Sequence, residues 1–314
     1  MGFFKKLFGG KEETPEEEHK EKVEKDFDVL KYDGVTALKT RNTEYAIQCF
    51  KAALQRKDDL ETRDYLSQAY IQNNELLPAY DELQKLADAQ PDNKQIFVRM
   101  AHVAFLMEDY NAMSVACEKA KLIDKDDAQV NYFYAKACLG QNDLINAIAM
   151  LTKAITVADQ HKEEESEEAQ KNAAFLPAMY LLRGETLLKM GDVKSADEDA
   201  TLLLDMTDSE LTDAEDIYLL KARVEHAKQQ LDEAITYYNK VIEANPFSID
   251  AFRERGAVYL EKGDKIHATE DAEHLLELNP NEAKAVNGDY KAEGTEDIQQ
   301  KMEQTYKNNN PYGF

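Results

Sequence analysis

The chain has 314 residues, of which 43% are apolar and 32% are charged, and its formal net charge at pH 7 is -24. This charge argues against nonspecific nucleic-acid binding, because the phosphate backbone would be repelled overall, but it leaves room for a local basic groove. Three widely spaced cysteines without a CxxC pair argue against a disulfide framework or a zinc module and favour a reducing, cytoplasmic compartment.

The first ten residues, MGFFKKLFGG, are predicted to form an amphipathic N-terminal arm. In a helix the four bulky apolar side chains share one face, and the two lysines flank it. The lysines interrupt the apolar stretch, which argues against a secretory signal, and Lys6 breaks the myristoylation pattern. Two interpretations stay open: weak peripheral contact with the inner face of a membrane, or a tail that is disordered or docks on the protein itself. The candidate membrane-contact residues are Phe3, Phe4, Lys5, Lys6, Leu7 and Phe8.

Residues 11–26 follow as an acidic, proline-containing segment that is predicted to be a linker. The region 27–282 is predicted to be nearly all helix, because glycine and proline are scarce and no alternating strand pattern persists. Pro91, Pro246 and Pro280 each end a helical stretch, and the last two lie 34 residues apart. Most stretches carry a bulky residue near the start, a small residue four positions later and an alanine in the second half.

This period and pattern resemble the tetratricopeptide repeat, a 34-residue helix-turn-helix, in its bacterial multi-repeat form. Aligned on the family pattern, seven repeats begin at Phe27, Leu60, Lys94, Ala128, Pro177, Glu215 and Ile249. The resemblance implies an all-α fold, a right-handed solenoid of about seven helix-turn-helix repeats. An insertion at residues 162–176 and a smaller one at 211–214 break the period. The larger insertion is predicted to lengthen the flanking helices, either as a tolerated surface feature or as a docking element.

Three positions within the repeats support the alignment. Position eight, where the two helices of a repeat approach closely, carries a small residue: Gly34, Ser67, Ala101, Ala135, Gly184, Ala222 and Gly256. Position twenty is an alanine in six repeats, and only the third repeat departs, with Met113. Position sixteen holds a residue that is expected to cap the second helix, contributing about 1 kcal/mol each: Asn42, Asp109, Asp143, Asp192 and Asp264.

Residues 283–314 lack the repeat pattern and are predicted to form a C-terminal capping helix and a tail. Thr295 would cap this helix, and Ile298, Met302 and Tyr306 would lie on one side of it. Such a helix covers the apolar face that a stack of helix pairs otherwise leaves exposed at its end.

The resemblance implies a concave groove lined by positions two, five, nine and twelve of each repeat. At these positions Phe105 and Tyr132 contribute aromatic rings, and several basic side chains add local positive charge inside an acidic shell. That combination suits an extended peptide or a helix with apolar anchors and some acidic groups. Position twelve has an equally weighted interpretation as core packing between repeats. The candidate partner contacts are Lys31, Arg99, His102, Phe105, Tyr132, Lys136, Arg223 and Arg253.

One binding mode of the family, a clamp for the C-terminal carboxylate of heat-shock chaperones, is poorly matched. Lys31 and Arg99 fit two of its places, whereas Val35, Tyr65 and Gln95 do not fit the other three. Glutamate at both Lys136 and Arg223 is expected to abolish partner capture without unfolding the chain.

No HExxH, GxGxxG, P-loop or GxSxG pattern occurs, so neither an enzyme activity nor a cofactor or metal site is expected. The sequence therefore predicts a cytoplasmic, non-catalytic scaffold that binds a protein partner in its groove and does not bind nucleic acid. Two alternatives stay open. One is a membrane-associated assembly factor recruited by the N-terminal arm, and the other is a regulatory subunit of an enzyme that docks through the insertion. The partner and the oligomeric state are not encoded in the pattern.

Overall fold

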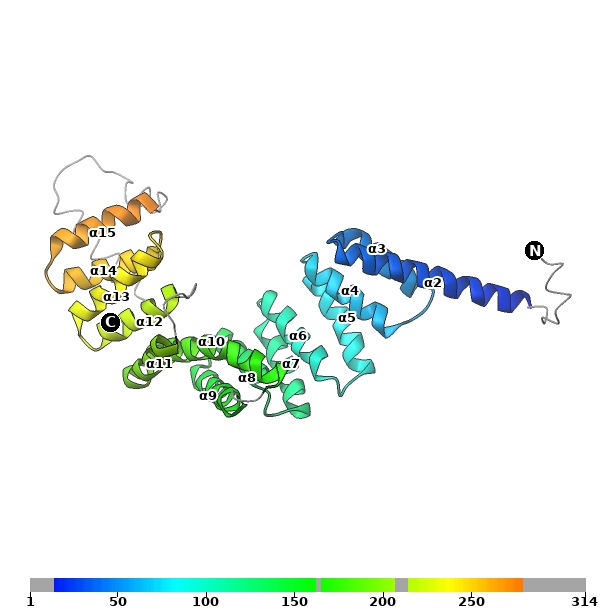
Figure 1. Ribbon diagram of the computed structural model, residues 1–314, viewed down its shortest axis with the longest axis horizontal. Helices are drawn as coiled ribbons and strands as arrows, with labels where there is room; N and C mark the ends of the chain where they lie inside the picture. Colours follow the sequence, from blue (N-terminus) through cyan, green and yellow to red (C-terminus); the bar gives the residue numbers. More distant parts are fainter. Residues whose placement is uncertain (1–13, 162–164, 207–213, 279–314) are drawn as a thin grey trace. The chain divides into compact units, whose positions relative to one another are not determined.

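The computed structural model describes residues 14–161, 165–206 and 214–278 (Figure 1). The N-terminal arm, the predicted C-terminal capping helix and part of each insertion lie outside these ranges. The described residues form α-helices joined by short turns, without strands. The first helices of the repeats are α2 (Pro15–Lys39), α4 (Leu60–Gln72), α6 (Lys94–Leu106), α8 (Ala128–Gly140), α10 (Glu167–Lys189), α12 (Ala214–Ala227) and α14 (Ile249–Glu261). The second helices are α3 (Thr43–Leu54), α5 (Leu76–Ala89), α7 (Tyr110–Ile123), α9 (Leu144–His161), α11 (Val193–Met206), α13 (Leu231–Ala244) and α15 (Lys265–Leu278).

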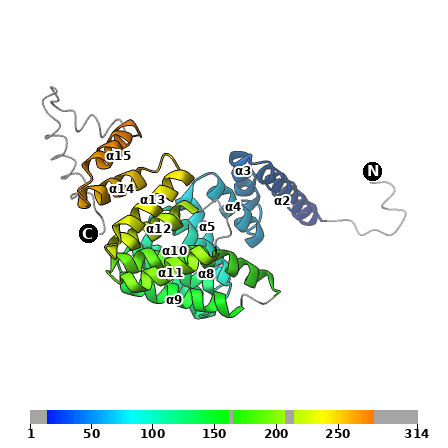
Figure 2. The same ribbon diagram turned by 60° about the vertical axis from the view of Figure 1, so that its left-hand side comes forward.

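The chain divides into two compact halves, residues 1–142 and 143–314. In the N-terminal half each helix from α2 to α8 packs against the next one along the chain, and α6 also contacts α8. In the C-terminal half the same order holds from α9 to α15, with α10 also contacting α12 (Figure 2). Packing between sequence neighbours with little long-range contact is the property of a solenoid. Each half is therefore an all-α solenoid.

The turns between the two helices of a repeat share one backbone device. One residue in each turn has a positive φ of 57° to 84°. At six of these turns the N–H of the next residue donates to a carbonyl five residues earlier, as from Asp109 to Ala104 at 2.9 Å, which is the Schellman ending of a helix. The steps between these residues are the steps between the predicted repeat starts. The residues are Arg41, Asn74, Glu108, Asn142, Gly191, Gln229 and Gly263.

The small residues at positions eight and twenty lie where the helices of a repeat meet. All seven residues at position eight are buried. The alanines at position twenty are at most 1% exposed, and Met113, their counterpart in the third repeat, is fully buried too. At Gly34 an added Cβ would lie 2.6 Å from Cε1 of Phe50.

Replacing Gly34 by alanine is expected to destabilise the N-terminal half by about 2 kcal/mol. Phe50 is fully buried, so its ring cannot move away from the new Cβ without displacing its neighbours. The overlap between the Cβ and the ring therefore costs about 3 kcal/mol. Alanine recovers only about 1 kcal/mol of helix propensity. The free energy of unfolding, measured by urea denaturation, tests this. Adding Phe50→Leu should restore part of the loss, and strictly additive effects of the two substitutions would contradict the proposed overlap.

Side-chain caps explain where most helices begin. The predicted caps Asp109, Asp143, Asp192 and Asp264 each accept a backbone N–H from three residues ahead, at 2.9 to 3.2 Å. The prediction was wrong for Asn42, whose side chain makes no capping bond.

The predicted linker differs from the structure, because α2 begins at Pro15, twelve residues before the predicted first repeat. Thr14 and Glu17 form a reciprocal capping box there, with Thr14 N donating to Glu17 at 2.7 Å. Proline at the first helical position further favours this start. The Ser166 hydroxyl caps α10 by accepting the Ala169 N–H at 3.0 Å, so residues 167–176 of the insertion extend that helix.

Candidate functional site

Helices α6 and α8 bring five predicted or neighbouring groove residues together in the N-terminal half. We call this set the aromatic–lysine surface: His102 and Phe105 on α6, and Tyr132, Phe133 and Lys136 on α8. The His102 and Phe133 rings lie 6.3 Å apart, and the Tyr132 and Phe133 rings lie 6.1 Å apart, measured between centroids. The spacings i, i+3 on α6 and i, i+4 on α8 place these side chains on one face of each helix.

Lys136 is the centre of this surface. Its ammonium lies 3.7 Å from the centroid of the Phe105 ring and 5.6 Å from that of Tyr132. Cation–π attraction at such distances contributes about 0.5–2 kcal/mol. Burial lowers the pKa of Lys136. No carboxylate in the described part of the chain forms an ion pair with it, so the rings, and not an acid, hold this cation.

Phe133 is the member that the sequence did not single out. It occupies position six, outside the positions that the family resemblance assigns to the groove. Its ring contacts both His102 and Tyr132. The sequence signal that could have identified Phe133 is the pair of adjacent aromatic residues at 132 and 133, one helical turn before Lys136.

The predicted groove cations of the C-terminal half are paired. The Arg223 side chain is only 9% exposed, and its guanidinium donates to both carboxylate oxygens of Glu254 at 2.6 to 3.0 Å. Tyr238 donates to the same carboxylate at 3.0 Å. Arg253 pairs with Asp250 at 2.7 Å. The prediction that these arginines add local positive charge is therefore corrected, since each guanidinium is neutralised by an acid one repeat or one turn away.

A half-buried carboxyl lies near the same network. Glu185 stands at position nine of its repeat, as Lys136 and Arg223 do in theirs. Burial raises the pKa of Glu185, and Arg223 partly offsets that rise. The positive charge of Arg223 thus stabilises the carboxylates of both Glu185 on α10 and Glu254 on α14. Arg223 is therefore part of the packing of the C-terminal half.

Position twelve serves both of its predicted roles. Leu38, Leu188 and His226 are at most 9% exposed and belong to the core. Phe105 and Leu139 are half-buried and remain accessible.

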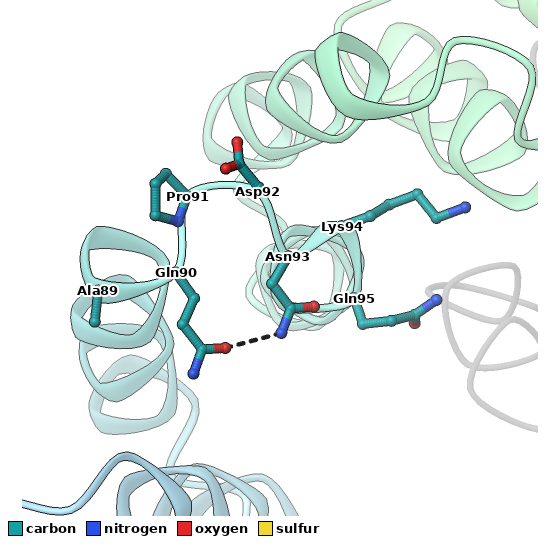
Figure 3. Close-up of a pocket in the computed structure, with 7 residues that line it drawn as sticks. All are labelled: Ala89, Gln90, Pro91, Asp92, Asn93, Lys94 and Gln95. Carbon is teal, nitrogen blue, oxygen red and sulfur yellow. Dashed lines mark hydrogen bonds between the residues drawn. The ribbon is translucent and has the colours of Figure 1, made fainter.

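The loop between α5 and α6 encloses a shallow hollow of about 600 Å³, lined by residues 89–95 (Figure 3). Asn93 donates a hydrogen bond to the Gln90 side chain across it at 2.9 Å. None of the predicted contact residues lines this hollow, and its walls hold no cluster of acid–base groups.

No metal or membrane feature was found in the residues that the structure describes. No group of three or more His, Cys, Asp or Glu side chains is placed to hold a metal ion. No described helix is both long enough and apolar enough to cross a membrane. The three cysteines are buried, and burial raises the pKa of Cys117 to about 12, so its thiol stays protonated at neutral pH.

Comparison with known proteins agrees with the repeat geometry. Residues 222–263 match the family model described as TPR repeat. This segment is therefore a tetratricopeptide repeat. A search of curated protein sequences found no match.

Solved structures of other repeat proteins share the fold at low sequence identity. PilW, described as a widely conserved type IV pilus biogenesis factor, matches with a TM-score of 0.57 and 16% identity over 70% of this chain and 94% of its own. A tetratricopeptide repeat protein from Parabacteroides merdae matches with a TM-score of 0.57 and 12% identity over 90% and 99%. Pseudomonas aeruginosa PilF matches with a TM-score of 0.52 and 15% identity over 73% and 96%. These likenesses concern the fold alone.

The two cations that fit the chaperone clamp already bind the chain's own acids. Lys31 donates to Asp59 at 3.0 Å and to Glu61 at 2.6 Å. Arg99 pairs with Asp64. A partner carboxylate would have to displace these acids, which disfavours a clamp at this place. Among the predicted contacts, the aromatic–lysine surface therefore offers the accessible cation.

Proposed function

We propose that the protein is a non-catalytic interaction scaffold whose partner docks on the aromatic–lysine surface. The observation that carries the proposal is the state of Lys136. Its ammonium lies against Phe105 and Tyr132 without an ion pair among the described residues, whereas Lys31, Arg99, Arg223 and Arg253 are neutralised.

The surface selects for a particular chemistry. Half-buried rings offer faces to an aromatic or branched aliphatic side chain, and the partly dehydrated ammonium gains most from a carboxylate. A hydrogen bond to a charged group contributes about 1.5–3 kcal/mol. The expected ligand is therefore a peptide segment with an apolar anchor next to Asp or Glu.

The acidic character of the chain does not prevent this contact. The net charge is -24, but acids farther from Lys136 than the Debye length, about 8 Å at physiological salt, are largely screened. Short-range attraction to an unpaired ammonium then outweighs the screened repulsion of distant acids.

Selection from a random peptide display library tests the proposal. Peptides enriched by the full chain should combine an aromatic or aliphatic residue with a nearby Asp or Glu. Lys136→Gln should lose this enrichment, and Lys119→Gln, which changes an exposed lysine on α7, should retain it. Enrichment of basic peptides, or the same enrichment by Lys136→Gln, would count against the surface.

The affinity for a selected acidic peptide is expected to fall as the pH rises. The peptide carboxylate is ionised throughout, so the loss of charge comes from Lys136. Because burial lowers the pKa of Lys136, this loss begins at a lower pH than for an ordinary lysine of pKa 10.5. Fluorescence anisotropy across alkaline pH measures it. Lys136→Arg keeps its charge and should bind without this dependence, and an unchanged pH profile in that variant would show that another group titrates.

A further inference from the structure

The first repeat exposes a helix face that every later repeat buries. Position three is the clearest case. Val29, at position three of the first repeat, is 59% exposed. In the other six repeats this position is at most 4% exposed, at Thr62, Ile96, Val130, Met179, Ile217 and Ala251.

Position ten behaves in the same way. Thr36 is exposed in the first repeat. Its counterparts are at most 3% exposed, at Ala69, Val103, Ala137, Thr186, Val224 and Val258. Tyr32 lies between Val29 and Thr36 on α2 and is 73% exposed. We call Val29, Tyr32 and Thr36 the leading face.

The packing order explains the exposure. Helices α4, α6 and α8 each pack on the second helix of the repeat before them, namely α3, α5 and α7. Helix α2 has no such predecessor among the described residues. The leading face therefore corresponds to the surface that, in each later repeat, packs against the preceding repeat. A solenoid must cover such a terminal surface to remain soluble and monomeric.

We propose that residues 3–8 of the N-terminal arm dock on the leading face of the same molecule and cap the first repeat. This inference is independent of the partner site proposed above. It assigns the arm an intramolecular role.

The tether is long enough for this contact. Val29 lies 14 residues into α2, or about 21 Å along the helix axis. The seven steps from Phe8 to Pro15 span at most about 24 Å when extended. The chain must reverse its direction just before Pro15 to run back along α2.

Chemistry and tethering both favour the arm over other occupants. Phe3, Phe4, Leu7 and Phe8 supply the apolar cover that the leading face lacks. Lys5 and Lys6 match the charge of Asp26 and Asp33, which flank the face on α2 and form no ion pair within the described residues. Covalent attachment also holds the arm at an effective concentration of about millimolar, far above that of a second copy at ordinary protein concentrations.

The chain contains no tryptophan, so Phe4→Trp introduces a single fluorescent probe into the full-length protein. Docking predicts blue-shifted emission and weak quenching by acrylamide. Adding Val29→Asp and Tyr32→Asp should shift the emission to the red and raise the quenching constant several-fold. The matched control adds Val115→Asp and Leu122→Asp on α7, where the native side chains are 54% and 82% exposed, and should leave the probe shielded. Circular dichroism checks that all variants are folded.

Three results would overturn the proposal. Solvent-exposed emission in the parent Phe4→Trp protein would mean that the arm is free. Shielding of the tryptophan that disappears on dilution would mean that the arm docks on a second copy of the chain. Shielding that appears only with vesicles containing anionic phospholipid would assign it to a membrane surface.

Discussion

Replacing Arg223 by methionine is expected to lower the free energy of unfolding of the C-terminal half by about 3–5 kcal/mol, the range for breaking a buried ion pair. The substitution leaves Glu254, whose side chain is only 19% exposed, without its guanidinium partner. It also removes the positive charge that offsets the burial of Glu185. Urea denaturation followed by circular dichroism, with the transition of this half resolved, measures the loss.

Arg253→Met is the matched control. Arg253, at position five, is also a predicted groove residue, but its side chain is 23% exposed and that of its partner Asp250 is 51% exposed. Such pairs contribute about 0–1 kcal/mol. Equal losses for the two variants would show that Arg223 is no more structural than a surface arginine. The expectation that Arg223→Glu acts on binding alone is thus replaced by an expectation of unfolding.

Replacing Lys136 by glutamate is expected to weaken binding of a selected acidic peptide by about 10- to 100-fold. The substitution removes a charged hydrogen bond worth about 1.5–3 kcal/mol and places like charges together. Because Lys136 forms no ion pair within the described residues, its replacement leaves no carboxylate there without a partner. The free energy of unfolding should therefore change little. Isothermal titration calorimetry measures the affinity, and urea denaturation measures the stability.

Lys119→Glu provides the control for Lys136→Glu. It changes the net charge by the same amount, within the same half, on the exposed face of α7. An equal loss of affinity in both variants would mean that the effect is long-range repulsion and not a local contact.

The repeats could be predicted from sequence because their determinants are local and recur at fixed spacing. Gly34 and Ala46 mark the close approach of two helices regardless of what lies farther along the chain. Helix starts were harder to predict where a cap lay outside the repeat, as Thr14 does for α2.

The electrostatic state of the site could not be predicted in the same way. Arg223 and Lys136 both stand at position nine, so the repeat pattern alone does not distinguish them. Their difference depends on which side chains face them, and for Arg223 this is Glu254 on the first helix of the next repeat. For Lys136 the neighbours are the Phe105 and Tyr132 rings. Only the placement of side chains across repeats distinguishes a neutralised cation from an accessible one.

Lysine footprinting is the most direct test of the aromatic–lysine surface. The full chain is acetylated briefly, with and without a saturating selected peptide, and the modification of each lysine is measured by mass spectrometry. We predict that the peptide lowers the modification rate of Lys136 several-fold and leaves Lys119 unchanged. An unchanged rate at Lys136, together with protection of lysines in the C-terminal half, would contradict the proposed site.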